Sequence, residues 1–225
     1  MKTALLALVA LTMTSACAHG PPPLADSGSW TRAADPVDVR IDLAEAMVRT
    51  DRPDSALKII RKARDEGLAG SDLTVVQARA LLAKGLDGES EALLDGVLQS
   101  NPRHAGALAA LGILYLDQKR TDAAADAFER AARRNPEDAD LLNNLGFALL
   151  VSKRYVEAEA ALREATRIDP ASDRARNNLG FALAALGRIQ EARQAFLAVV
   201  SPEDAEHNLR LAARLYPPNM NPETP

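Results

Sequence analysis

Few side chains in this chain of 225 residues are of the kinds that most often do chemistry. There is one cysteine, Cys17, and there are three histidines, His19, His104 and His207. The histidines lie far apart, and none belongs to a metal-binding spacing such as His-Glu-x-x-His. Neither a Gly-x-Ser-x-Gly sequence nor a glycine-rich phosphate-binding loop occurs. The sequence therefore predicts no catalysis, no cofactor and no bound metal, and it directs attention to Cys17.

The residues before Cys17 have the order of an export signal. Lys2 is followed by an apolar run over residues 4–13 and then by Thr14-Ser15-Ala16. The run is too short to cross a bilayer as a helix, which takes about 20 residues. The arrangement resembles the lipobox of bacterial lipoproteins, in which the cysteine is acylated and becomes the mature N-terminus, although Thr14 replaces the usual leucine. An ordinary signal-peptide cut nearby, which would leave a free thiol, is the alternative.

The lipobox resemblance implies a lipoprotein signal peptide over residues 1–16 and lipid attachment at Cys17. Several acyl chains together hold a protein on a membrane durably. In the sorting pattern of Gram-negative bacteria, a residue other than Asp after the cysteine, here Ala18, implies the periplasmic face of the outer membrane. Residues 17–36, which contain Pro21-Pro22-Pro23, are expected to form a Pro-rich tether between the lipid and the next part of the chain.

The rest of the chain repeats one pattern without insertion or deletion, in five blocks: 37–70, 71–104, 105–138, 139–172 and 173–206. Each block is 34 residues long and has a small residue at position 8, as at Gly146, a small one at position 20, as at Ala158, and a bulky one at position 24, as at Leu162. The spacing predicts two helices and a turn in each block, with Gly146 facing Ala158 where the helices approach. Thr121 is expected to cap the second helix of its hairpin.

This pattern resembles the tetratricopeptide (TPR) repeat, which is 34 residues long with small residues at positions 8 and 20 and a large apolar one at 24. The resemblance implies an all-α solenoid of five helical hairpins with a concave surface. Residues 205–216 echo the first helix of the fifth block, but Arg210 stands where that block has Gly180. We therefore predict a solvated C-terminal cap helix there. Residues 217–225, of which four are proline, are expected to be a disordered tail.

In TPR proteins the first helix of each hairpin lines the partner groove, chiefly at positions 2, 5, 9 and 12. The resemblance assigns this groove to Arg79, Ile113, Asp140, Asn143, Phe147, Arg174, Asn177 and Phe181. A bound peptide or helix would lay apolar side chains on the isoleucine and the phenylalanines, while the asparagines bond its backbone. A packing role stays open, because position 9 also contacts the neighbouring hairpin and because Asn144 and Asn178 are placed to bridge adjacent hairpins.

The composition favours a protein partner. The formal net charge is −4 and acidic and basic residues are interspersed, which argues against nucleic acid and indicates solvated helix faces. No small-molecule substrate is expected, and the membrane is expected to be reached only through the N-terminal lipid.

Two similar segments, Asn143-Asn144-Leu145-Gly146 and Asn177-Asn178-Leu179-Gly180, precede a degenerate last helix. Together with the lipobox and the tether, they resemble the TadD family of TPR lipoproteins of tight-adherence (Flp) pilus assembly. The resemblance implies a non-catalytic scaffold that aids assembly of a Tad/Flp-type pilus or secretion apparatus through the outer-membrane secretin. The alternative is a periplasmic TPR lipoprotein that scaffolds and regulates cell-wall hydrolases.

Overall fold

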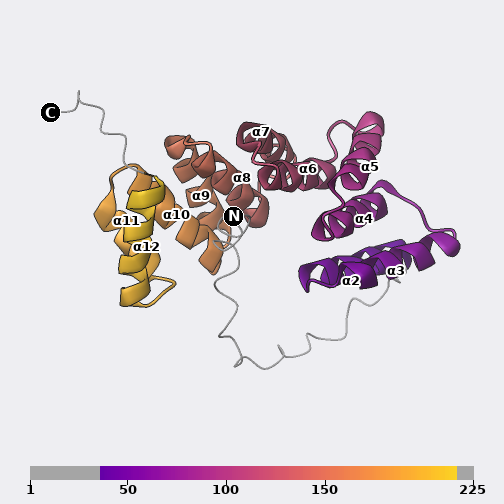
Figure 1. The fold of residues 1–225 in the computed structure, drawn as a ribbon, viewed down its shortest axis with the longest axis horizontal. Helices are drawn as coiled ribbons and strands as arrows, with labels where there is room; N and C mark the ends of the chain where they lie inside the picture. Colours follow the sequence, from indigo (N-terminus) through magenta and orange to yellow (C-terminus); the bar gives the residue numbers. More distant parts are fainter. Residues whose placement is uncertain (1–35, 217–225) are drawn as a thin grey trace, which may run out of the picture. The chain divides into compact units, whose positions relative to one another are not determined.

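The computed structural model describes residues 36–216, and within them the chain forms eleven α-helices and no strand (Figure 1). The helices are α2 (Pro36–Arg49), α3 (Pro53–Asp65), α4 (Ser71–Ala83), α5 (Asp87–Ser100), α6 (Ala105–Asp117), α7 (Thr121–Ala132), α8 (Ala139–Val151), α9 (Tyr155–Ile168), α10 (Asp173–Ala185), α11 (Ile189–Leu197) and α12 (Pro202–Leu215). The prediction of an all-α fold is confirmed. The predicted signal peptide, Cys17, the tether up to residue 35 and the tail over 217–225 lie outside the described residues.

Each 34-residue block holds two helices, so the described chain is a row of five hairpins followed by α12. Helix α12 begins at Pro202, earlier than the expected start at residue 205, because Ser201 caps it by accepting a hydrogen bond from the Asp204 N–H (3.2 Å). Arg210 on α12 is exposed, as a residue on the outer face of a cap helix should be. No helix within residues 36–216 combines the length and apolar character needed to cross a bilayer.

The helices that pack extensively belong either to one hairpin or to two successive hairpins. Buried Ile60 of α3 and Leu73 of α4 share one apolar cluster, and Leu94 of α5 and Leu114 of α6 share another. Each hairpin thus covers the apolar face of the one before it, which is how repeat proteins build a continuous core from local units.

The glycine at position 8 makes room for the bulky residue at position 24. A Cβ atom on Gly146 would lie 2.4 Å from Leu162 Cγ, so the bulky side chain at position 24 packs directly against the glycine. Positions 8 and 20 do meet in the second hairpin, where Ser90 Oγ donates to the Ala78 carbonyl oxygen (2.9 Å). The same close fit recurs at two equivalent pairs, Gly112 with Phe128 and Gly180 with Phe196.

The turn inside every hairpin contains one residue with left-handed backbone, always at position 15 of its block: Asp51, Gly85, Lys119, Lys153 and Gly187. Two of these are glycine, which adopts that conformation without steric cost, whereas the other three carry a Cβ atom that it disfavours. The turn geometry is therefore imposed by the packing of the two helices, since it persists where the residue type opposes it.

Helix capping differs from the sequence prediction. Thr121 is the first residue of α7 rather than its cap, and Arg120 precedes it without a side-chain hydrogen bond to the helix. The caps instead lie before the first helices, where His104, Asp138 and Ser172 each accept a backbone N–H from the residue three positions on. These side chains hold the start of α6, α8 and α10 in place.

Candidate functional site

Residues at the same block position on successive first helices lie next to each other. Arg79 on α4 forms an ion pair with Glu45 on α2, 34 positions earlier in the sequence, with Nη1 and Oε1 2.9 Å apart. Arg174 on α10 pairs in the same way with Asp140 on α8 at 2.5 Å. Positions 9 and 2 of the repeat therefore form rows across neighbouring helices. Sequence reasoning had missed Glu45, although its opposite charge one repeat before Arg79 was a visible signal.

The two predicted groove asparagines each accept a hydrogen bond from the next first helix. Asn178 Nδ2 on α10 donates to Asn143 Oδ1 on α8 (2.9 Å), and Asn208 Nδ2 on α12 donates to Asn177 Oδ1 on α10 (3.1 Å). Asn143 is 4% exposed, so its carbonyl oxygen needs this partner. Asn178 bridges neighbouring hairpins, as the packing alternative predicted. Asn143 and Asn177, the two groove candidates, also form bridges to the next helix in the row. Asn177 is half-buried and is the more accessible of the two.

The aromatic residues at position 9 differ in exposure. Phe181 is 2% exposed and packs edge-on against Phe196 (5.1 Å between ring centroids) and Tyr216 (6.4 Å). Tyr216 follows α12 and is itself buried, which raises the pKa of its phenol to about 12. Phe147 and Ile113 occupy the same repeat position on α8 and α6 but are only half-buried. Of the three apolar groove candidates, these two are accessible to a partner.

We call Ile113, Phe147 and Asn177, with the two ion pairs beside them, the first-helix surface. Two half-buried apolar side chains provide contact area, and the Asn177 amide provides polar contacts. The exposed ion pair of Arg174 and Asp140 adds one positive and one negative charge. Such a mixture suits an extended peptide or a helix that lies along the row. Sequence reasoning named these positions, and the structure shows that Asn143 and Phe181, from the same set, lie inside the packing.

The histidines in the described residues have structural surroundings. His104 Nδ1 accepts the Ala107 N–H at 3.3 Å, and its Nε2 lies 3.2 Å from Asp72 Oδ1, so the ring ties the start of α6 to α4. His207 is exposed on α12, and His19 lies outside the described residues. Across residues 36–216 no three His, Cys, Asp or Glu side chains converge in a way that would hold a metal ion.

Comparison with known proteins agrees with the hairpin architecture. Tetratricopeptide repeat models match residues 75–131, 109–173 and 149–215, which together span more than half of the chain. The structure of MamA (41-end) from Desulfovibrio magneticus RS-1 is 22% identical, covers 78% of this chain and 99% of its own, and has a TM-score of 0.58. TTC0263, a thermophilic TPR protein in Thermus thermophilus, is 21% identical over 80% of this chain and 98% of its own, with a TM-score of 0.62. No curated protein matches the chain.

At these identities the solved structures show the fold, and the matching family models are those of a repeat and include no enzyme family. The tetratricopeptide scaffold suggests protein–protein interaction through the surfaces that its hairpins present. Repeat length, hairpin order, the close fit of positions 8 and 24 and the family models all agree: the chain belongs to the tetratricopeptide repeat family.

Proposed function

We propose that this protein is a non-catalytic, membrane-anchored scaffold that aids assembly of a Tad/Flp-type pilus or secretion apparatus, with the outer-membrane secretin as its client. The TPR architecture supports the scaffold role, and the TadD-like segments together with the lipobox-like N-terminus support the pilus role. Lipid on Cys17 would hold the protein at the periplasmic face of the outer membrane, where secretin subunits assemble.

The observation that carries the proposal is the first-helix surface. Apolar side chains that remain half-buried at a repeated position still expose apolar surface to water. A partner that covers this surface gains binding free energy from its burial. The flanking ion pair of Arg174 and Asp140 is largely exposed, with side-chain exposures of 54% and 74%, so it can exchange partners at low cost. Ile113 and Phe147 are therefore the residues whose truncation should weaken client binding most.

The main experiment is a gene deletion, complemented with variants and scored in the same membranes for secretin multimers and surface pili. Wild-type protein should restore both. The Ile113→Ala/Phe147→Ala variant should restore neither fully, because losing two contact side chains weakens binding by about tenfold or more. Val156→Ala is the matched control, since Val156 on α9 is 70% exposed and lies on a second helix. Each variant is first checked for folding by circular dichroism and for amount by immunoblot.

Three results would decide the matter. Loss of multimers and pili in the deletion strain, with secretin subunit still present, supports the proposal. Intact multimers and pili in the deletion strain refute the pilus role, and a search for cell-wall hydrolases among captured proteins would then follow. Full complementation by the folded Ile113→Ala/Phe147→Ala variant refutes the first-helix surface as the client site while leaving the scaffold role standing.

The membrane anchor is tested separately. Cys17→Ser removes the group that would be acylated, so the protein should move from the membrane fraction to the soluble periplasmic fraction and should no longer incorporate labelled palmitate. If the wild-type protein stayed in the membrane fraction but incorporated no labelled palmitate, this result would contradict lipidation at Cys17.

A further inference from the structure

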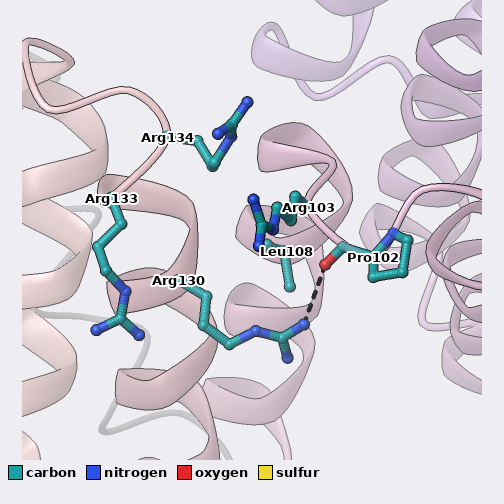
Figure 2. A pocket seen from close by; sticks show the side chains of 6 residues that line it. All are labelled: Pro102, Arg103, Leu108, Arg130, Arg133 and Arg134. Atoms are coloured by element: carbon teal, nitrogen blue, oxygen red, sulfur yellow. Dashed lines mark hydrogen bonds between the residues drawn. The ribbon is translucent and has the colours of Figure 1, made fainter.

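A pocket of about 470 Å³ lies where the connection between α5 and α6 meets the end of α7 (Figure 2). It is lined by Pro102, Arg103, Leu108, Arg130, Arg133 and Arg134, so four of its six lining residues are arginine. Leu108 on α6 is 1% exposed and gives the pocket an apolar wall. We call it the arginine pocket. None of its residues belongs to the first-helix surface.

The positive charge in the arginine pocket is only partly balanced. Arg130 donates to the carbonyl oxygen of Pro102 (3.1 Å), as Figure 2 shows, and Arg133 pairs with Glu129 on its own helix (2.7 Å). Within residues 36–216, the guanidinium groups of Arg103 and Arg134 form no ion pair and no hydrogen bond. Among these four guanidinium groups, only that of Arg133 forms an ion pair within the described residues, in a chain whose net charge is negative.

The repeat itself does not require this cluster. One repeat further on, the residues equivalent to Arg103, Arg130 and Arg134 are Glu137, Glu164 and Ile168. There Glu164 pairs with Arg167, so that junction is nearly neutral. The helix dipole does stabilise cations in the last turn of α7. That effect leaves Arg103 unexplained, because Arg103 comes from the connection before α6 and not from α7.

The chemistry of the pocket fits a carboxylate ligand. A guanidinium group presents a planar fork that binds a carboxylate through two parallel hydrogen bonds, and two such forks are free here. Pro102, which is exposed, adds apolar contact for the methylene groups and the backbone of a peptide. We propose that the arginine pocket binds an acidic peptide segment of a protein partner, as a second contact site that rests on the scaffold function proposed above.

The test is fluorescence anisotropy of the full protein with a labelled hexapeptide that carries three carboxylates around a leucine. The isosteric peptide with amides in place of the carboxylates is the ligand control. The acidic peptide should bind at least about tenfold more tightly than the amide peptide, and its affinity should fall as salt is added. Arg103→Gln/Arg134→Gln should reduce binding of the acidic peptide by about tenfold or more.

The protein control makes the same change of charge elsewhere. Arg61→Gln/Arg210→Gln removes two exposed arginines on α3 and α12 and should bind the acidic peptide as the wild type does. Because all four arginines are exposed, both double variants should keep the wild-type thermal melt, which shows that any loss of binding is local. An equal loss in both double variants would mean that only the net charge matters, and it would overturn the proposal.

The remaining outcomes separate this proposal from its competitors. Equal binding of the acidic and amide peptides, or wild-type affinity in Arg103→Gln/Arg134→Gln, overturns it. Vesicles of phosphatidylglycerol that bind through the arginine pocket while the peptide does not would overturn it in favour of a lipid phosphate. The Ile113→Ala/Phe147→Ala variant should bind the acidic peptide normally. The arginine pocket and the first-helix surface can therefore fail independently.

Discussion

Replacing Gly146 by alanine tests the packing rule on which the whole array depends. In an open helix interior this change stabilises a protein by about 1 kcal/mol, because alanine has the better helix propensity. At Gly146 the added Cβ atom would lie 2.4 Å from Cγ, 2.7 Å from Cδ2 and 3.1 Å from Cδ1 of Leu162. Leu162 is fully buried, so its side chain has no free space into which it can turn.

The expected magnitude follows from these two opposing terms. Forcing a methyl group into a well-packed core costs about 1–3 kcal/mol, and here the clash involves the branch point of the leucine, so we take the upper part of that range. After the gain in helix propensity, Gly146→Ala should lower the free energy of unfolding by about 1–2 kcal/mol. Gly96→Ala on α5 is the matched control, because no atom beyond the neighbouring backbone of its own helix lies within 4 Å of the Cβ it would add. It should raise the free energy of unfolding by about 0.5–1 kcal/mol.

The assay is urea unfolding followed by circular dichroism, with Leu162→Ala and Gly146→Ala/Leu162→Ala completing a double-mutant cycle. Leu162→Ala alone should cost about 2–5 kcal/mol, because it leaves a cavity. In the double variant the new methyl group partly fills that cavity, so the loss should be smaller than the sum of the two single losses by about 1 kcal/mol or more. If Gly146→Ala stabilises the protein as Gly96→Ala does, or if the two losses simply add, the packing rule is refuted.

Three further predictions concern the turns, an ion-pair cluster and the cap. Lys153→Gly should raise the free energy of unfolding by about 0.5 kcal/mol in urea melts, because relief of left-handed strain (φ 63°) exceeds the entropy cost of glycine. Burial opposes ionisation of Glu159, but hydrogen bonds from Arg163 and Arg188 outweigh this effect and hold the pKa of Glu159 below its usual range. The ionised carboxylate therefore stabilises the folded protein. This stabilisation is complete above the usual pKa of Glu, about 4.3, and is lost as the pH falls further. Glu159→Gln should accordingly show a smaller loss of stability between pH 6 and pH 3 than the wild type, and an equal loss would contradict the assignment. Tyr216→Ala should cost about 3 kcal/mol and expose Phe181, measured by urea unfolding and by binding of a hydrophobic dye; an unchanged midpoint would show that the cap does not seal the array.

Much of the fold followed from the sequence because a TPR array is specified by a local unit. The alternation of Gly146-like, Ala158-like and Leu162-like positions every 34 residues is sufficient to predict two helices per block and their order. Cap positions were harder. Thr121 had the right residue type in the right region, but whether a side chain caps a helix depends on backbone angles that the residue type does not set.

The candidate site was predictable only as a set of positions. Repeat register placed Phe147 and Phe181 at position 9, and nothing in the sequence ranked one above the other. The segments Asn143-Asn144 and Asn177-Asn178 look alike as well, yet Asn143 is buried in the array and Asn177 stays accessible. The lipid anchor at Cys17 and the pilus role are predictions that rest on resemblance and await the experiments described above.

The sequence alone determined the helical period, the hairpin order and which positions of each block are small or bulky, because these depend on neighbours within one block. Tertiary structure alone decided in which repeats the side chain at position 9 is accessible to a partner. Phe181 is buried because Tyr216, after the cap helix, lies against its ring, whereas Phe147 stays half-buried. Likewise Arg103 and Arg134 line one pocket because α6 and α7 fold back on each other. Exposure depends on what covers a residue, and the covering residue here comes from another part of the chain, where no local pattern records it.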